Sequence, residues 1–314
     1  MRVFTGVYSA VTTARNSLFD TGFLEAKRLA RPVISIGNIS TGGSGKTPFV
    51  IHLGELLAAR GYTFDVLSRG YRRSTRGVLE VSANGRPEQY GDEPLLIKRK
   101  LHCPVFVGAD RYAAGLLAER EAPAAQVHLL DDGFQHRKLH RDFDIVMLNP
   151  EDLDDRMLPL GRLREPISSL QRADAVIVDR EFPFSKLPKG RFQIWQIERK
   201  VELPSFSNPA IAFCGVARPQ RFFSALRNQG VELREEVIFR DHHRYTTHDV
   251  NRLLRIRQAM PNAQFVTTEK DAINLGPQFA SLNPVIVPLR VTLLNPESAV
   301  DYMFQTLSAR HRDA

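Results

Sequence analysis

The stretch Ile36-Gly37-Asn38-Ile39-Ser40-Thr41-Gly42-Gly43-Ser44-Gly45-Lys46-Thr47-Pro48 decides the fold of this chain. It is a glycine-rich loop that ends in Gly-Lys-Thr and directly follows an apolar run typical of a buried strand. Glycines let successive backbone N–H groups turn inward around a phosphate chain, and a helix that starts behind the loop directs the positive end of its dipole at the anion. The stretch therefore predicts a phosphate-binding loop, followed by a helix from Phe49 to Ala59.

The loop supplies the candidate nucleotide-binding residues, which are Ser40, Thr41, Gly42, Gly43, Ser44, Gly45, Lys46 and Thr47. Lys46 is expected to reach the β- and γ-phosphates, and the hydroxyl of Thr47 is expected to bind Mg²⁺. Ser40 occupies the position at which the usual pattern has its first glycine, and the neighbouring glycines can compensate. The alternative of a flexible loop that binds nothing is disfavoured, because strand, glycines, Lys-Thr and helix follow in the required order.

Composition restricts the class of protein further. The chain has 314 residues, of which 43% are hydrophobic, and this length suits one large or two medium globular domains. Its net charge of +8 indicates an anionic partner, either a nucleic acid, a phosphorylated substrate or an acidic membrane surface. Two cysteines, Cys103 and Cys214, lie in apolar contexts, so we expect no disulfide framework and a reducing compartment.

The N-terminal segment predicts an amphipathic helix. Phe4, Val7, Tyr8 and Val11 recur at helical spacing, with Arg2 before them and Arg15, Lys27, Arg28 and Arg31 after them. Their apolar stripe could pack on the core of the protein, which the sequence slightly favours, or lie in a membrane interface. No run of 18 apolar residues is present, so we expect no membrane span.

Beyond the loop, predicted strands and helices alternate, which indicates a parallel sheet with crossover helices. We expect strands at 64–68, 78–81, 105–107, 127–130, 143–148 and 175–178, helices at 95–100 and 110–121, and a hairpin turn at Asn84-Gly85. A second β/α series follows a boundary near residue 200. The predicted fold is α/β, with a P-loop NTPase-like, mostly parallel sheet covered by helices on both faces in residues 1–200 and a second, smaller α/β domain in residues 201–314.

Two acidic residues, Asp131 and Asp132, follow the predicted strand 127–130. The carboxyl end of a strand beside the phosphate loop is where a doubly wound sheet places its functional groups. A carboxylate there can hold Mg²⁺ opposite the hydroxyl of Thr47. The pair is therefore interpreted as the acidic element of a nucleotide-binding site, rather than as a solvated turn.

With these elements placed, an ordered set of motifs closely resembles the tetraacyldisaccharide 4'-kinase family over nearly the whole chain. The motifs are Gly-Asn-Ile-Ser-Thr-Gly-Gly-Ser-Gly-Lys-Thr-Pro at 37–48, Ser-Arg-Gly-Tyr at 68–71, Gly-Asp-Glu-Pro at 91–94, Asp-Asp-Gly-Phe-Gln-His at 131–136, Leu-Arg-Glu-Pro at 163–166, Phe-x-Asp-His-His-x-Tyr at 239–245 and Thr-Thr-Glu-Lys-Asp at 267–271. The resemblance implies ATP and Mg²⁺ as cofactors and phosphorylation of the 4'-hydroxyl of an acylated disaccharide 1-phosphate in lipid A biosynthesis. It also implies a peripheral location at the cytoplasmic face of the bacterial inner membrane and an active site in the cleft between the two domains. We further expect a monomer that binds no nucleic acid.

The resemblance also implies catalytic roles. Lys46 would bind the transferred phosphoryl group, and Asp92 would be the base that accepts the proton of the sugar hydroxyl. His242 would pair with Asp92 across the cleft, with His243 as the alternative imidazole, and Asp132 resembles the residue that orients this histidine.

For the metal, the resemblance implies that Asp131 and Glu165 join Thr47 around Mg²⁺ or its water shell. Five arginines offer forked donors for phosphate groups, namely Arg69, Arg72, Arg73, Arg162 and Arg164. The segment Thr268-Glu269-Lys270 has no assigned chemistry, and we expect a structural or substrate-cleft role there.

Two other classes of protein share a phosphate loop. A regulatory GTPase would need an Asn-Lys-x-Asp guanine-reading segment, and in this chain Glu269-Lys270-Asp271 places the Lys and Asp side by side. A nucleic-acid-linked ATPase would fit the basic charge, but the Lys and Arg residues are scattered and not interleaved with aromatic residues. The sequence therefore favours the kinase.

Overall fold

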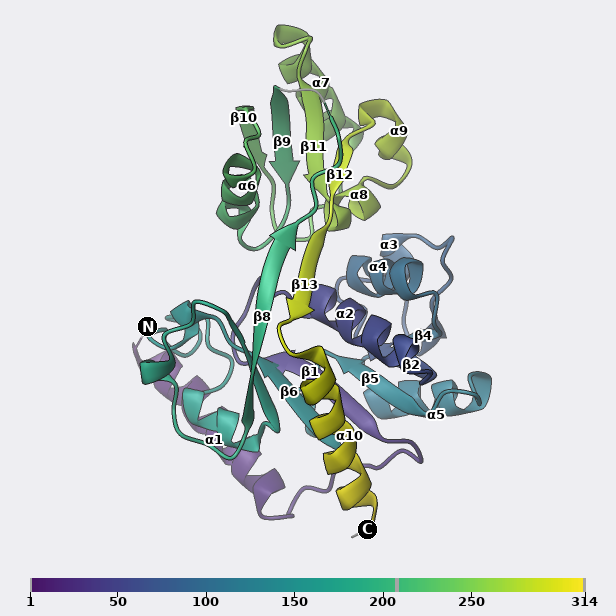
Figure 1. Cartoon of the computed structure of the whole chain (residues 1–314), viewed down its shortest axis with the longest axis vertical. Helices are drawn as coiled ribbons and strands as arrows, with labels where there is room; N and C mark the ends of the chain where they lie inside the picture. Colours follow the sequence, from purple (N-terminus) through teal and green to yellow (C-terminus); the bar gives the residue numbers. More distant parts are fainter. Residues whose placement is uncertain (1, 207–208, 313–314) are drawn as a thin grey trace.

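A computed structural model of the chain describes residues 2–206 and 209–312. Within these ranges the strands form two sheets (Figure 1). The first sheet has nine strands in the order β13-β8-β7-β6-β1-β5-β2-β4-β3, and the second has four in the order β10-β9-β11-β12. We call the nine-stranded sheet with its helices the first unit, and the four-stranded sheet with its helices the second unit.

The first unit is built mainly from the N-terminal two thirds of the chain. Its strands are β1 (Val33–Asn38), β2 (Phe64–Ser68), β3 (Leu79–Glu80), β4 (Val105–Val107), β5 (Val127–Asp131), β6 (Phe143–Met147), β7 (Ala175–Asp179), β8 (Gln193–Val201) and β13 (Leu289–Leu293). Its helices are α1 (Arg2–Asp20), α2 (Lys46–Ala59), α3 (Pro87–Tyr90), α4 (Asp92–Leu101), α5 (Arg111–Glu121) and α10 (Pro296–Arg312), with short 3₁₀ turns at Pro150–Asp152, Ile167–Arg172 and Phe184–Lys186.

The central strand of the first sheet is β1, which pairs in parallel with β5 on one side and β6 on the other. Strands β4, β2, β5, β1, β6, β7 and β8 are parallel neighbours, and only the edge strands β3 and β13 run antiparallel. All six residues of β1 are buried, as expected for a strand covered on both faces. The phosphate loop therefore leaves the carboxyl end of the middle strand, beside the carboxyl ends of β5 and β2.

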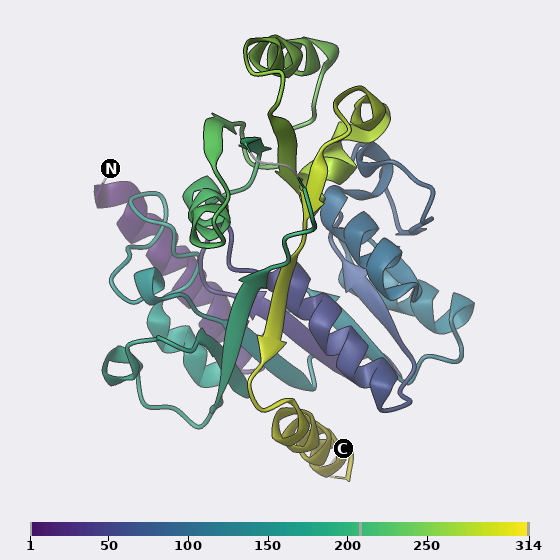
Figure 2. The same cartoon turned by 45° about the horizontal axis from the view of Figure 1, so that its top comes forward.

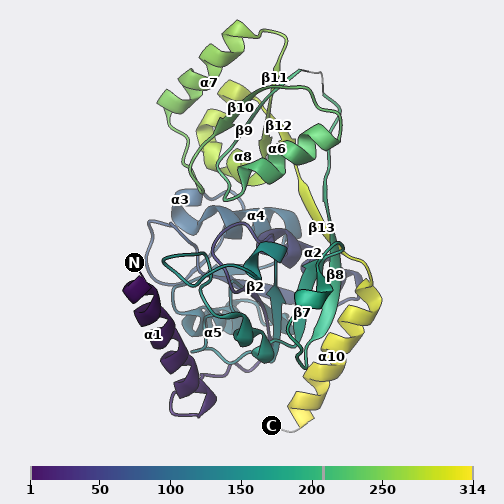
Figure 3. The same ribbon diagram turned by 90° about the vertical axis from the view of Figure 1, so that its left-hand side faces the viewer.

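Helices cover both faces of this sheet, as the sequence predicted. Apolar residues of α2, α4 and α10 share one core with β1, β2 and β6. On the opposite face, α5 packs with Leu67, Phe106 and Leu130 of the sheet. Figure 3 shows α1 and α10 on opposite sides of the first unit.

The second unit is a smaller parallel α/β layer. Its strands are β9 (Ala210–Cys214), β10 (Leu233–Ile238), β11 (Gln264–Thr268) and β12 (Val285–Val287), and its helices are α6 (Pro219–Asn228), α7 (Thr247–Ala259), α8 (Glu269–Leu275) and α9 (Phe279–Leu282), with a 3₁₀ turn at Gly276–Gln278. Phe223 and Leu226 of α6 pack on one face of the sheet, and Leu253 of α7 packs on the other.

Two strands connect the units (Figure 1). The chain leaves the first unit through β8 and returns through β13, which pairs antiparallel with β8 from Leu289↔Val201 to Leu293↔Ile197. Strand β13 therefore belongs to the first sheet, and α10 packs in the core of the first unit. The predicted second domain of residues 201–314 thus extends too far at its C-terminal end. Strand periodicity does not tell which of two sheets a strand joins, because that choice depends on long-range pairing.

The N-terminal helix forms as predicted, but its packing is the reverse of the favoured alternative. From residue 5 to the end of the helix, the buried residues are polar Thr12 and Asn16, whereas Val7 and Val11 are 57% and 63% exposed. Asn16 is held inside because its amide donates to Glu165 Oε2 at 2.6 Å. Val7 and Val11 of the stripe therefore face outward, whereas Tyr8 is half-buried and its hydroxyl donates to Arg164 O at 3.2 Å. The side chain of Phe4 lies outside the described residues.

The hairpin predicted at Asn84-Gly85 is also wrong. The strand before it, β3, pairs with β4, and the chain after the turn enters helix α3. The turn itself is present, since Gly85 N donates to Ser82 O at 2.9 Å. Pro87 begins a helix here because its fixed φ suits a first helical turn and a strand would need its missing N–H.

Among the described residues, none of the helices is both long and apolar enough to cross a membrane.

Candidate active site

The phosphate loop has the backbone conformation that its glycines allow. Gly42, Gly43 and Gly45 have φ values of 80°, 44° and 84°, a left-handed region that other residues rarely adopt. Helix α2 begins at Lys46, directly behind Gly45, three residues earlier than predicted. Ser40 is fully buried at the start of the loop, so the missing first glycine leaves the loop geometry intact.

Lys46 is held in place by groups at the end of β1 and β5. Its Nζ donates to Asn38 Oδ1 at 3.0 Å and lies 3.4 Å from Asp132 Oδ1. The carboxylate of Asp132 also accepts two bonds from Arg164, at 2.9 and 3.1 Å. Burial tends to raise the pKa of Asp132, but the charges of Lys46 and Arg164 outweigh it and hold that pKa far below its usual range. Asp132 is therefore a fixed anion that orients Lys46 and Arg164 toward the loop. We expected Asp132 to orient His242, but the partners of its carboxylate are these two cations.

Asp131 is different from its neighbour in sequence. Its side chain is buried, Oδ2 accepts a bond from Ser68 Oγ at 3.0 Å, and Oδ1 has no hydrogen-bond partner among the described residues. Burial, together with the nearby charges of Glu93 and Asp132, raises the pKa of Asp131 to about 7. A buried carboxylate with an unused oxygen at a strand end suits a divalent cation, because a cation would remove the cost of the desolvated charge.

Glu165 does not join Asp131 and Thr47. Its Oε2 accepts bonds from Asn16 at 2.6 Å and Arg172 at 2.9 Å, so the carboxylate ties α1 to the 3₁₀ turn at Ile167–Arg172. Asp131 and Thr47 line the cavity described below, and Glu165 is not among its lining residues. In this structure Glu165 Oε2 therefore serves as a structural link, while Oε1 has no hydrogen-bond partner among the described residues.

Asp92 and His242 meet although 150 residues separate them. Asp92 is the first residue of α4, and His242 lies in the loop after β10, where it takes a left-handed φ of 56°. His242 Nδ1 lies 2.8 and 3.0 Å from the two carboxylate oxygens of Asp92. The pairing expected between the two units is therefore present in the structure.

The pKa values of Asp92 and His242 shift in opposite directions. Burial tends to raise the pKa of Asp92, but the bond to His242 and the charge of Lys270 lower it well below its usual range. Burial tends to lower the pKa of His242, and its bond to Asp92 outweighs that effect and raises the pKa above 6.5. Asp92 is thus the anion of the pair, and the imidazole is the group that titrates.

The rival imidazole of His243 faces elsewhere. Its Nε2 lies 3.0 Å from Asp249 Oδ2 at the start of α7, and its ring stacks on Phe239 with centroids 4.8 Å apart. The structure therefore selects His242 as the partner of Asp92.

A cavity of about 550 Å³ lies between the units. The phosphate loop with Lys46 and Asp131 lines one side, and His242 with Lys270 lines the other. Asp92 is not among the lining residues and is only 5% exposed. Figure 2 shows α6 and α4 on the two sides of the strands that connect the units.

Three arginines of this cavity were not singled out from the sequence, namely Arg199, Arg218 and Arg221. Arg199 of β8 donates to the backbone oxygen of Ser44 at 2.9 Å. Arg218, at the start of α6, packs its side chain so closely on Gly43 that a Cβ there would lie 3.1 Å from Arg218 Cγ. The position of Arg218 after a strand and before a helix was a usable signal, whereas Arg199 lies inside a strand and had none.

The five arginines proposed for phosphate recognition divide into two groups. Arg69 and Arg164 line the cavity. Arg72 donates to the backbone oxygen of Asp241 at 2.6 Å, Arg73 donates to Val107 O and Gly77 O, and Arg162 pairs with Asp155. The second group therefore holds loops together.

Comparison with known proteins gives a consistent result. A model of the family Tetraacyldisaccharide-1-P 4'-kinase matches residues 1–308. The chain is 43% identical to the tetraacyldisaccharide 4'-kinase of Koribacter versatilis over 321 aligned positions, covering 99% of both chains, and 41% identical to that of Aquifex aeolicus, covering 77% of this chain and 82% of the relative. A crystal structure of LpxK from Aquifex aeolicus in complex with ATP superimposes with a TM-score of 0.79 at 34% identity, covering 97% of each chain.

Proposed function

The chain belongs to the tetraacyldisaccharide-1-P 4'-kinase family, and from this premise we propose that it transfers the γ-phosphoryl group of ATP to the 4'-hydroxyl of a tetraacyldisaccharide 1-phosphate. The reaction belongs to lipid A biosynthesis. One observation of the structure carries the proposal: a phosphate loop and an imidazole paired with a carboxylate line the same cavity from two units. Phosphoryl transfer to an alcohol needs both groups, one for the nucleotide and one for the hydroxyl proton.

The nucleotide would bind along the loop. Its backbone N–H groups and Lys46 would hold the β- and γ-phosphates, and Arg164 would add a second cation from the same edge of the sheet. Arg218 would approach the phosphates from the second unit, because its side chain already packs on Gly43 and lines the cavity. Its Nη1 contacts Glu151 at 3.2 Å, a partner that leaves other donors of the fork for an anion.

Mg²⁺ would be held by Thr47 and Asp131, both of which line the cavity. Oxygen donors suit this ion, and the unused Oδ1 of Asp131 fits it. When bound, Mg²⁺ supplies charge neutralisation of the phosphate oxygens. Asp132 would stay outside this set, because Lys46 and Arg164 already occupy its oxygens.

We assign the roles of base and partner the other way round from the sequence-based expectation. The carboxylate of Asp92 accepts donors on both oxygens, is buried and does not line the cavity. His242 does line it, and because Nδ1 faces Asp92, the lone pair of a neutral imidazole is on Nε2. Nε2 lies 3.8 Å from Asp241 Oδ2, beyond hydrogen-bond range. We therefore assign the base to His242 Nε2 and its orientation to Asp92.

The glycolipid would reach this cavity from a bilayer surface. Val7, Val11 and Leu18 of α1 are exposed, and Phe23 beyond the helix is 79% exposed. An apolar stripe with basic neighbours suits the cytoplasmic face of the bacterial inner membrane, where α1 would lie in the interface. The chain would act there as a peripheral protein and a monomer, without nucleic acid.

The test is transfer of radiolabel from Mg-ATP to a detergent-dispersed tetraacyldisaccharide 1-phosphate. The expected product carries the label on the 4' oxygen, and the Lys46→Ala variant should transfer it about 10²-fold or more slowly. Hydrolysis of ATP or GTP without labelled lipid would instead support the regulatory or nucleic-acid-linked ATPase or GTPase, which the family relationship does not favour.

A further inference from the structure

Helix α8 of the second unit lies directly against α4 of the first unit. It begins after Thr268, in the segment for which the sequence suggested no chemistry, and it ends at Leu275. Its neighbour α4 carries Asp92 at its first position. Helix α8 therefore meets the helix that carries Asp92, as does the loop with His242.

Asn274 of α8 reaches this carboxylate. Its Nδ2 donates to Asp92 Oδ2 at 3.0 Å, and the two side chains are 8% and 5% exposed. The other donors to Asp92 are its neighbouring backbone group, Glu93 N at 2.9 Å from Oδ1, and His242 Nδ1. With donors on three sides, the carboxylate plane is set and both oxygens face the imidazole.

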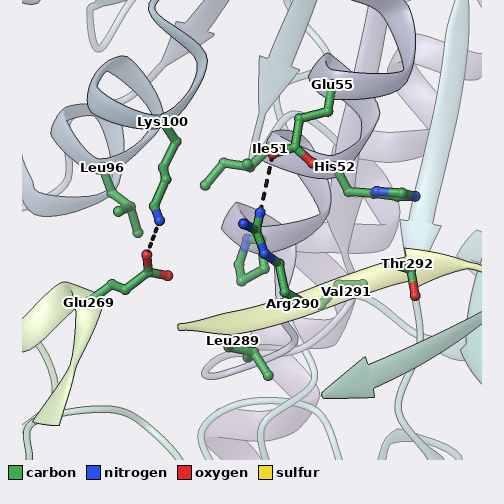
Figure 4. Close-up of a pocket in the computed structure, with 11 residues that line it drawn as sticks. Ile51, His52, Glu55, Leu96, Lys100, Glu269, Leu289, Arg290, Val291 and Thr292 are labelled. Carbon is green, nitrogen blue, oxygen red and sulfur yellow. Dashed lines mark hydrogen bonds and ion pairs between the residues drawn. The ribbon is translucent and has the colours of Figure 1, made fainter. Parts of the chain in front are cut away.

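Two ion pairs set the position of α8 along α4. Lys270 Nζ contacts Glu93 Oε1, next to Asp92, and Lys100 Nζ contacts Glu269 Oε1 farther along α4. Figure 4 shows the second pair, with Lys100 of α4 and Glu269 at the start of α8 pointing toward each other. Because the two ion pairs lie at different points along α4, they prevent α8 from sliding along it. The amide of Asn274 is therefore held opposite Asp92.

The same helix also supports the loop that carries His242. Asp271 Oδ1 accepts bonds from Gly215 N at 2.7 Å and Tyr245 OH at 2.8 Å. Gly215 O in turn accepts the backbone N–H of His242 at 3.0 Å. Helix α8 thus holds the imidazole through Asp271 and the carboxylate through Asn274.

We infer that Asn274 is a positioning residue for the phosphoryl transfer. It completes a chain of hydrogen bonds, Asn274–Asp92–His242, across the two units. The inference rests on the proposed function, because it assigns His242 as the base. Asn274 touches no reacting atom. It holds Asp92 in the plane that keeps His242 Nδ1 bonded and Nε2 directed into the cavity.

The experiment compares Asn274→Leu and Asn274→Ala with the wild-type chain. Both changes remove the amide donor, and Leu keeps nearly the same volume. We expect kcat to fall about tenfold or more with the KM for ATP nearly unchanged, since a hydrogen bond to a charged group is lost and the loop is untouched. The matched control is Asn251→Leu, the same change at an exposed position of α7, which should retain wild-type kcat.

Two further readouts separate positioning from mere stabilisation. In an Asp92→Ala background, Asn274→Leu should have little further effect, because it acts through Asp92. Equal losses in both backgrounds would overturn the inference.

The second readout is the imidazole titration of His242 by NMR, assigned with a His242→Gln variant. The charged groups that face His242 are Asp92 and Glu93 of α4, Lys270 of α8, its neighbour Asp241, and Arg72, which donates to its backbone oxygen. In Asn274→Leu the carboxylate can rotate away from Nδ1, so the pKa of His242 should fall. An unchanged pKa would contradict the inference, and this readout does not depend on which substrate the wild-type enzyme phosphorylates.

Discussion

The phosphate loop and the Asp92–His242 pair line one cavity, but they are built in opposite ways. The loop is a run of neighbouring residues whose geometry comes from three glycines with positive φ and the helix that follows. The pair joins residues 150 positions apart, one on each unit, and depends on α8, α4 and the loop after β10. The phosphate loop therefore takes its shape within one unit, whereas the Asp92–His242 pair forms only when both units are in contact.

This difference predicts which kinetic step a mutation in each region should affect. Changes in the loop should affect every step that involves phosphate, and changes at the contact between the units should affect mainly the chemical step. Each prediction below tests this separation.

The largest effect is expected at the contact. His242→Ala should lower kcat by about 10²- to 10³-fold with little change in ATP affinity, because general-base catalysis contributes about that much. Steady-state kinetics with varied ATP and glycolipid measure it. His243→Ala is the matched control, since its imidazole faces Asp249 and the change should cost far less.

Asp92 and His242 should also behave as one unit. The double variant Asp92→Ala/His242→Ala should be little worse than His242→Ala alone. A loss of kcat in the double variant equal to the product of the two single losses would indicate independent roles and contradict the pairing.

The loop should respond differently. Lys46→Ala should lower kcat/KM for ATP by about 10²-fold or more, the scale of losing one charge partner of the transition state. It should also weaken ATP binding measured by calorimetry, because the proposed contact of Lys46 with the phosphates exists in the bound ground state as well. A Lys46→Ala variant with normal kcat and normal ATP affinity would place the nucleotide elsewhere.

The pH dependence sharpens the assignment of the base. The pKa of His242 is raised above 6.5, and a base works only when deprotonated, so kcat/KM should rise with pH through a value above 6.5. In Asp92→Asn the raising partner is lost while burial still lowers the pKa of His242, so the acid limb should move to lower pH. A limb that stays in place in the variant would mean that another group titrates.

The smallest effect on kcat is expected at α1. Val11→Asp places a charge on an exposed apolar stripe, so it should weaken binding to anionic vesicles and raise the KM for glycolipid several-fold at unchanged kcat. Thr13→Asp adds the same charge at an exposed polar position of the helix and serves as the control. Vesicle sedimentation measures binding, and equal losses in both variants would mean that charge alone, and not the stripe, determines it.

Much of the nucleotide half of the site could be predicted from the sequence. The loop at 37–48, the strand before it and the acids after β5 are read from neighbouring residues, because backbone conformation and strand ends depend on local order. The order of strands and helices was predictable for the same reason, and most boundaries lie within one or two residues of the expected ones.

The structure alone decided which groups meet. It selected His242 over His243, moved Glu165 to a contact with Asn16, and returned β13 and α10 to the first unit. Neither the outward stripe of α1 nor the amide of Asn274 on Asp92 has a signature in local periodicity.

The sequence by itself determined a phosphate loop on a parallel α/β sheet, because glycine conformation, strand alternation and helix starts depend on residues close together in the chain. Only the tertiary structure decided that His242 faces the cavity while Asp92 is buried behind it. The physical reason is that burial and hydrogen-bond partners set which of two coupled groups carries the proton, and here those partners come from residues 93, 242 and 274 on two different units.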